Sequence, residues 1–225
     1  MAAKGLGEGW YFTKSEIEKS SPSRIDGFDA GKEDRLRKSY CRFIKDVGME
    51  LKLPHVTIAR AIIYCHRFYL RQSHSKNDRY TIATGCLLLA NKVMEARRKL
   101  LNDLTVLSNE FLHENGDPAT AERIKEPHFF EQRKQLLLKA EHFLLSTLNF
   151  DFDIETPYKP LASALKKFNA FQWHSKFAQV SWNFVSDGLM TTVCLQFKPR
   201  QVAGAAFYLA SRGLQVQMQW AQKQA

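Results

Sequence analysis

Apolar residues recur at helical spacing over most of the chain. Two sets step by four, three and four residues, which places each set on one face of a helix: Ile58, Ile62, Cys65 and Tyr69, then Ile82, Cys86, Leu89 and Val93. A similar stripe recurs in the second half: Val202, Ala205, Leu209, Gly213 and Val216. No stretch alternates apolar and polar residues as a half-buried strand would. The pattern therefore predicts an all-α fold.

Capping residues, proline and glycine divide this pattern into elements. Thr13, with Glu16 at capping-box spacing, should cap a short helix that reaches Lys19 and is broken by Pro22. Further helices are expected over residues 32–51, 54–71, 80–96, 101–113 and 128–148, and a turn over 115–118. After Pro157 and Pro160, helices are expected near residues 158–169, 173–187, 189–195 and 199–218.

A weak internal repeat suggests how these helices are grouped. Residues 82–92 read IATGCLLLANK and residues 202–212 read VAGAAFYLASR, an offset of 120. A repeat at this spacing favours two copies of one helical domain, each with this helix at its buried centre. We therefore expect an N-terminal extension at 1–31, a first five-helix domain at 32–153 and a second at 154–225, which leaves room for the natural chain to continue.

The two copies differ in one respect that bears on function. The first copy carries Lys92 and Glu95 three residues apart on one helix face, and the second copy does not. This asymmetry indicates a specialised surface on the first domain.

Composition narrows the class of protein. Hydrophobic residues make up 44% of 225 residues, which is ample for a packed core. No apolar run reaches the roughly 18 residues of a membrane span, and the first residues lack the apolar segment of a signal peptide, so we expect a soluble intracellular protein without a membrane partner. The net charge of +10 suggests an acidic partner, either nucleic acid or an acidic protein face.

Catalytic and metal-binding patterns are missing from the sequence. The seven histidines show no metal-ligand spacing, and there is no glycine-rich phosphate loop and no G-x-S-x-G sequence. The four cysteines form no C-x-x-C pair and fall among apolar residues, so we expect buried, reduced thiols. His66, beside an apolar stripe, is expected to be a hydrogen-bonded structural residue. We expect neither an enzyme nor a cofactor.

Several short runs together resemble one family. Trp10-Tyr11-Phe12-Thr13 and Ser21-Pro22-Ser23-Arg24 are similar to the N-terminal segment of transcriptional cyclins of the T and K types. Similar runs continue along the chain: Ile62-Ile63-Tyr64, His66-Arg67-Phe68-Tyr69, Leu87 to Glu95, Ala140 to Leu145, Leu148-Asn149-Phe150, and Leu189 to Phe197. The resemblance implies two tandem cyclin boxes.

The resemblance also implies a kinase-binding surface. In cyclins the first box grips its kinase through a lysine and a glutamate, which correspond to Lys92 and Glu141. By the same correspondence, Leu88, Leu145 and Phe150 would be apolar contacts, although Leu88 and Phe150 can also be read as core residues and Lys92 as a solvated lysine. Glu95 is the remaining acid where the family usually has two, because Met94 replaces the first.

Two basic residues depart further from the family pattern. Arg97 and Arg98 stand where the family often has a polar residue and a proline. Their positive charge is expected to influence the choice of partner.

By this resemblance the chain would be the activating subunit of a cyclin-dependent kinase that phosphorylates the tail of RNA polymerase II during elongation. It would be nuclear and monomeric apart from the kinase, with acidic protein or RNA cofactors as further candidate partners. The helix at residues 32–51 lacks the docking pattern of cell-cycle cyclins. A general transcription factor of the TFIIB type remains the alternative, since those proteins carry the same fold and bind DNA through a basic surface.

The N-terminal aromatics raise a separate question. Trp10, Tyr11 and Phe12 are too apolar to remain in water, and a helix as short as 13–19 is marginal alone. We expect the aromatics to dock on the body of the protein itself, even without a kinase.

Overall fold

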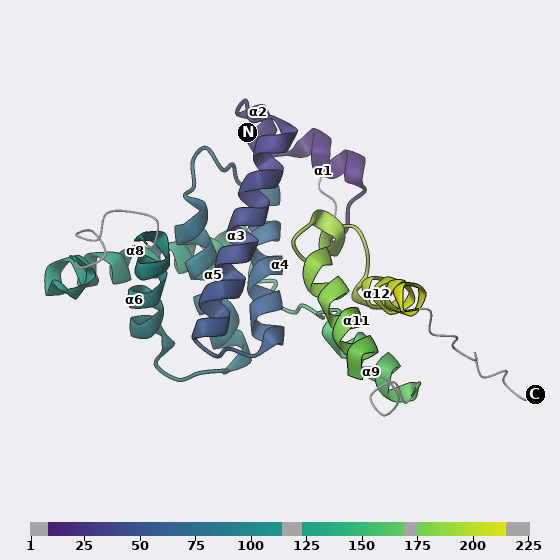
Figure 1. Ribbon diagram of the computed structural model, residues 1–225. Helices are drawn as coiled ribbons and strands as arrows, with labels where there is room; N and C mark the ends of the chain where they lie inside the picture. The colour runs from purple at the N-terminus through teal and green to yellow at the C-terminus, as the bar shows by residue number, and fades with distance from the viewer. Residues whose placement is uncertain (1–8, 114–122, 169–174, 215–225) are drawn as a thin grey trace, which may run out of the picture.

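The computed structural model describes residues 9–113, 123–168 and 175–214. Within these ranges the regular elements are helices and no strand occurs, so the predicted all-α fold is confirmed. Figure 1 shows two groups of helices side by side, with α1 crossing above the space between them. The expected turn at residues 115–118 lies outside the described residues.

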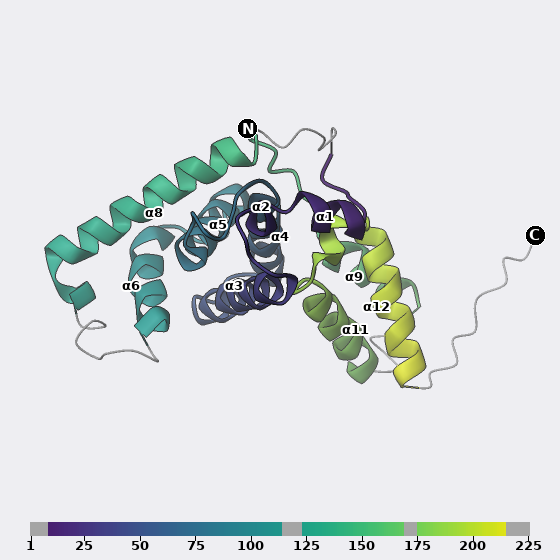
Figure 2. The same ribbon diagram turned by 90° about the horizontal axis from the view of Figure 1, so that it is seen from above.

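The first group contains most of the described chain. Its helices are α3 (Ala30–Glu50), α4 (His55–Arg71), α5 (Arg79–Met94), α6 (Leu100–His113), the 3₁₀ helix η1 (Arg123–Lys125) and α8 (Pro127–Thr147). Every residue from 82 to 91 of α5 is buried, because α3, α4, α6 and α8 all pack against it. Figure 2 shows α8 running along the outer side of this group. The prediction that this helix forms the buried centre of the first domain is confirmed.

The second group is smaller. It contains α9 (Tyr158–Lys167), α11 (Ser175–Gly188), the 3₁₀ helix η2 (Thr192–Leu195) and α12 (Pro199–Gly213). Five helices were expected here, and the described residues supply three α-helices and one 3₁₀ turn.

Helices α5 and α12 begin 120 residues apart, as the internal repeat requires, but they are buried differently. In α12 the buried residues are Val202, Ala203, Ala206, Phe207 and Ala210, and their partners in α5 are buried too. The adjoining face of α12 is open: Tyr208 is 56% and Leu209 49% exposed. The prediction of α12 as a buried centre, with Ala205 and Leu209 on the apolar face, is therefore wrong for the described residues. The physical reason is that only α9, α11 and η2 pack closely on α12.

Helix α4 joins the two groups of helices. The buried His66 lies within 2.8 Å of the main-chain oxygen of Leu189, at the end of α11, and its other ring nitrogen lies 2.7 Å from the Tyr40 hydroxyl. Burial lowers the pKa of His66 to about 3, so the ring is neutral near pH 7. Its Nε2–H then donates to Leu189 and its Nδ1 accepts from Tyr40. The prediction of a hydrogen-bonded structural histidine is confirmed.

The N-terminal segment docks on this body. Helix α1 (Lys14–Ser20) begins with the predicted capping box between Thr13 and Glu16, and Pro22 opens a further short helix, α2 (Pro22–Ile25). Trp10 is buried, Phe12 is partly buried and its amide donates to the main-chain oxygen of Leu195 in η2 at 2.8 Å, whereas Tyr11 is 47% exposed. Docking without a kinase is thus seen for two of the three aromatics.

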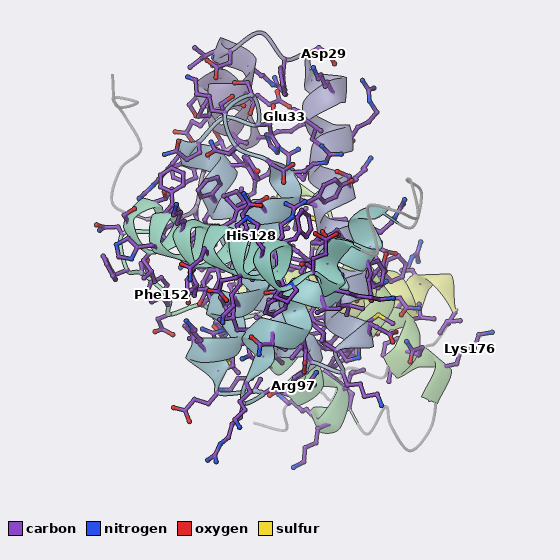
Figure 3. All side chains as sticks on the ribbon, turned by 90° about the vertical axis from the view of Figure 1, so that its left-hand side faces the viewer. Asp29, Glu33, Arg97, His128, Phe152 and Lys176 are labelled. Carbon is purple, nitrogen blue, oxygen red and sulfur yellow. The ribbon has the colours of Figure 1, made fainter. Side chains whose placement is uncertain are left out.

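The Ser21–Arg24 run fastens the segment that follows. Ser21 donates to Glu33 at 3.0 Å, Arg24 binds the same carboxylate at 3.0 Å, and Ser23 lies 2.9 Å from His74 Nδ1. Figure 3 shows Glu33 near the start of α3, beside Asp29, the residue that caps this helix. The short motif therefore has a structural role, because its side chains bind α3 and the segment after α4.

Candidate functional site

Lys92 and Glu141 lie together on the surface of the first group of helices. The Lys92 ammonium donates to Glu141 Oε2 at 2.7 Å, so α5 and α8 are joined by an ion pair between residues 49 positions apart. The Lys92 side chain is 53% exposed and that of Glu141 only 10%. An ammonium group has three N–H donors. One of them binds Glu141, so the other two remain available to a partner protein.

Gly85 explains why α8 comes so close to α5. A Cβ at this position would lie 2.9 Å from Leu144 Cδ1 and 3.4 Å from the Cβ of Ala140, both on α8. The absent side chain lets the two helices approach, and Glu141 follows Ala140 in the sequence. The close contact of these helices therefore brings the Glu141 carboxylate within reach of Lys92.

Glu95 lies just beyond the end of α5, in the left-handed region at φ +46°. The amide of Ala96 donates to the main-chain oxygen of Asn91, and the Asn91 side chain donates to the main-chain oxygen of Arg97 at 2.9 Å. These hydrogen bonds fold the chain back at the helix end, as in a Schellman motif. The Glu95 side chain is left exposed close to Lys92 in the sequence.

Arg97 is engaged within the chain. Its guanidinium donates to the main-chain oxygen of Leu51 at 3.1 Å and pairs with Asp103 at 2.5 Å, while Arg98 is exposed. Figure 3, which looks onto α8, shows Arg97 below that helix. Arg97 therefore joins the loop after α5 to the end of α3 and to α6, and the influence of Arg97 and Arg98 on partner choice stays a prediction.

The predicted apolar contacts are placed unequally. Leu88 is 2% exposed, so it has almost no surface to offer a partner and belongs to the core that supports Lys92 from beneath. Leu145 is partly buried against the core, and Phe150 is 67% exposed. Leu88 and Phe150 could each have been a core residue or a surface contact. In the structure Leu88 is a core residue and Phe150 lies on the surface.

Sequence reasoning missed further exposed apolar residues beside Lys92 and on α8. Val93 is 39% and Met94 37% exposed, directly after Lys92. Phe143 on α8 is 39% exposed, and its ring contacts Phe68 of α4. Val93 was predicted to share the buried stripe of α5, but it lies in the last turn of that helix, where the side chain remains exposed. The sequence did contain a signal for this surface: the apolar run that ends at Ala90 continues after Lys92 with Val93 and Met94.

The rest of the described surface gives no support to a catalytic site. A groove of about 740 Å³ lies between the two groups of helices, with Ile58 and Ile62 of α4 facing Tyr158 and Trp182. Three of its lining residues are charged or a histidine, and they are not hydrogen-bonded to one another: Lys45, His55 and Asp187. In the described ranges no group of three His, Cys, Asp or Glu side chains is placed to hold a metal ion, and no helix is both long and apolar enough to cross a membrane.

The cysteines are free thiols rather than ligands or disulfides. Cys41, Cys65 and Cys86 are buried, and Cys194 is partly buried. Burial raises the pKa of Cys41 and Cys65 well above the usual range and that of Cys194 to about 12. Thiols held in the protonated form are poor nucleophiles. The expectation of buried thiols is confirmed for Cys41, Cys65 and Cys86 and only in part for Cys194.

Comparison with known proteins identifies the family. The model of the cyclin N-terminal domain matches residues 9–153. The chain is 54% identical over 209 residues to Cyclin-T1-4 of Arabidopsis thaliana, covering 93% of this chain and 38% of that protein. It is 40% identical over 200 residues to the putative cyclin-T1-1 of the same plant, covering 89% of this chain and 77% of the relative.

Among solved structures, a chain of the yeast RNA Pol II CTD kinase CTDK-1 complex superposes with a TM-score of 0.78 at 20% identity. The match covers 96% of this chain and 66% of that one, and it shows the fold. The chain belongs to the cyclin family. Within that family it is a cyclin of the T type. It spans only about two fifths of the length of the first curated relatives that it matches.

Proposed function

We propose that this chain is the regulatory, activating subunit of a cyclin-dependent kinase that phosphorylates the C-terminal tail of RNA polymerase II during transcription elongation. The observation that carries the proposal is the Lys92–Glu141 pair, held at 2.7 Å with the Lys92 side chain half exposed. Val93, Met94 and Phe150 are exposed apolar residues of the same group of helices. The T-type relatives and the solved chain from a CTD kinase complex support it. The cyclin itself contributes binding and does not catalyse the transfer.

The proposed contact surface combines charge with apolar area. Lys92 donates to main-chain oxygens at a helix end of the kinase, where the carbonyl dipoles favour a cation, and Glu141 fixes the lysine. Glu95 supplies a second charge beside it. Leu145 and Phe150, joined by Val93 and Met94, supply apolar area, and Leu88 supports the surface from the core.

Activation on this surface is a population shift. A kinase whose mobile helix samples active and inactive poses is driven toward the active pose only if the cyclin binds that pose more tightly. Helices α5 and α8 form a rigid platform because they pack closely at Gly85, so the cyclin does not deform to fit both poses. To move a kinase from about 1% to about 99% active, the difference in affinity must be about 10⁴-fold.

The setting of this activity is part of the proposal. The chain acts in the nucleus, as a monomer apart from its kinase. The net charge of +10 supports acidic protein or RNA cofactors as further partners. We also propose that residues 154–225 belong to a second cyclin box, since α12 begins 120 residues after α5. The TFIIB-type alternative is not retained, because the family match is to the cyclin N-terminal domain.

Paired substitution of the ion pair tests the proposal. Lys92→Ala with Glu141→Ala should weaken binding to a purified transcriptional cyclin-dependent kinase by about 2–5 kcal/mol in isothermal titration, and should reduce activation of that kinase on a polymerase-tail peptide. Lys134→Ala with Glu131→Ala is the matched control, because this pair is an exposed contact on the same helix α8. Unchanged affinity would reject the site, and a collapsed melting curve would show that the pair is structural.

A further inference from the structure

Trp10 contacts two arginines of α4. Its ring is 4.5 Å from the Arg67 guanidinium and 4.2 Å from that of Arg71, both within the range of a cation–π contact. The indole N–H donates to Asp151 Oδ2 at 2.6 Å, across 141 residues of sequence. Trp10 is 8% exposed, while its neighbour Tyr11 is 47% exposed. One aromatic of the N-terminal run thus contacts both α4 and the segment after α8.

The same arginines bind that segment directly. Arg71 donates to the main-chain oxygen of Thr147, at the last turn of α8, at 2.7 Å. Arg67 donates to the main-chain oxygen of Asp151 at 3.4 Å and lies 3.8 Å from its carboxylate. Arg67 and Arg71 are one helical turn apart, so they share a face of α4. Trp10 packs against both guanidinium groups and so restricts the positions from which they can bind.

The segment that they bind has an unusual backbone. Asn149 and Phe150 both occupy the left-handed region, at φ +53° and +55°. Their amides donate to the main-chain oxygens of Ser146 and Leu145, the hydrogen-bond pattern of a Schellman motif. Asparagine tolerates left-handed geometry, but it is unfavourable for phenylalanine, so at Phe150 it persists only where neighbouring contacts impose it. This backbone displays Phe150, which is 67% exposed.

We propose that Trp10 is a positioning residue of the kinase-binding surface: by bracing Arg67 and Arg71 and by binding Asp151, it holds the 147–151 turn in the conformation that displays Phe150. Trp10 makes no kinase contact in this account. The N-terminal extension then contributes to kinase binding, because it sets the conformation of the 147–151 turn. The inference rests on the proposed function, since it gives Phe150 its role.

Hydrogen exchange on the free protein tests the structural half of this inference. Trp10→Ala should speed exchange of the Asn149, Phe150 and Asp151 amides by about tenfold or more, because their hydrogen bonds open more often once the arginines are unbraced. Phe12→Ala is the matched control, since it removes the other docked aromatic of the same segment, whose amide binds Leu195 of η2. Equal exchange in the two variants would overturn the proposal.

A double-mutant cycle tests the binding half, with a purified transcriptional cyclin-dependent kinase as the probe. Trp10→Ala should weaken kinase binding by about tenfold, because the contact made by Phe150 is lost. In a chain that already carries Phe150→Ala, it should cause no further loss of affinity. With Lys92→Ala its effect should add fully. Trp10→Phe, which keeps a ring against the arginines but loses the indole N–H, should recover part of the affinity.

The outcomes separate this inference from the proposed function. If the unaltered chain does not bind the kinase, the proposed function fails and the binding half of the inference fails with it. If the chain binds and Phe150→Ala weakens binding, but Trp10→Ala has no effect or adds fully to Phe150→Ala, the inference alone is wrong. A loss in Trp10→Ala that Phe12→Ala reproduces would also overturn it, because both then act only through stability.

Discussion

His66 of α4 and Leu189 at the end of α11 are joined by a hydrogen bond of 2.8 Å that crosses the boundary between the two groups of helices. The neutral ring donates through Nε2–H to Leu189, and its Nδ1 accepts from the Tyr40 hydroxyl. A protonated His66 would turn both nitrogens into donors and place a charge in the core. The junction between the two halves therefore depends on the protonation state of one imidazole.

This dependence predicts a loss of stability in mild acid. Burial lowers the pKa of His66 to about 3 and, mainly by the same cause, that of His74 to about 3. Below about pH 6.5 these histidines are protonated in the unfolded chain but remain neutral in the folded chain. The free energy of unfolding therefore decreases as the pH is lowered. Each histidine contributes at most about 1.4 kcal/mol per pH unit. Urea unfolding between pH 7.5 and 5.0 measures the slope.

Substitutions identify the histidines responsible. His66→Gln should reduce the slope toward that of one remaining histidine, whereas His128→Gln should leave it unchanged because His128 is exposed at the start of α8. A slope that is equal in the unaltered chain and in His66→Gln would contradict the assignment.

Gly85 predicts an unusual cost for a favourable helix residue. Alanine is a better helix former than glycine, yet Gly85→Ala places a Cβ 2.9 Å from Leu144 and should destabilise the fold by about 1–3 kcal/mol through overpacking. Gly204→Ala in α12 is the matched control: no atom lies within 4 Å of the new Cβ, so it should stabilise by about 0.5–1 kcal/mol. Chemical denaturation measures both, and equal signs would disprove the packing argument.

Charge reversal separates the structural and binding roles of the Lys92–Glu141 pair. Lys92→Glu alone sets two carboxylates against each other and should lower the melting temperature. Adding Glu141→Lys restores an ion pair, so stability should recover to within about 0.5 kcal/mol of the unaltered chain. Kinase affinity should stay at least about tenfold weaker, because the ammonium no longer occupies the exposed position. Recovery of affinity together with stability would mean that the pair serves only to join α5 and α8.

Phe150 predicts opposite changes in stability and binding. Phe150→Gly should stabilise the free chain by about 1 kcal/mol, since it relieves a left-handed backbone and removes a side chain that is 67% exposed. The same change should weaken kinase binding. Asn149→Gly should give a smaller gain in stability, because asparagine tolerates this geometry, and should leave the affinity unaltered. Thermal melting and isothermal titration together provide the measurement.

Much of the fold follows from local rules in the sequence. The capping box at Thr13, the prolines at 54 and 157 and the four-three-four spacing of apolar residues fix the helices to within a few residues, because each depends on near neighbours. The stripe on α12 was misplaced because Ala205 and Leu209 fit the helical period as well as Ala206 and Ala210 do. Periodicity cannot choose between two adjacent apolar faces when the covering helices are unknown.

The site was only partly predictable for a related reason. The family resemblance singled out Lys92 and Glu141, but the ion pair between them came from the structure. The left-handed backbone at Phe150 could not be predicted, since an aromatic side chain does not favour it. The contacts of Arg97 could not be predicted either, because its acceptors, Leu51 and Asp103, lie in other elements. Contacts between distant segments decided these cases, and a single sequence does not display them.

The partners of α4 have a consequence for cooperativity. Through His66, Arg67 and Arg71 this one helix holds Leu189 of the second group, the turn after α8 and Trp10. None of these three segments can keep its native contacts once α4 has opened. Unfolding should therefore appear as one transition for both groups of helices. In native-state hydrogen exchange, the buried amides of α5 and α11 should then share a single opening free energy.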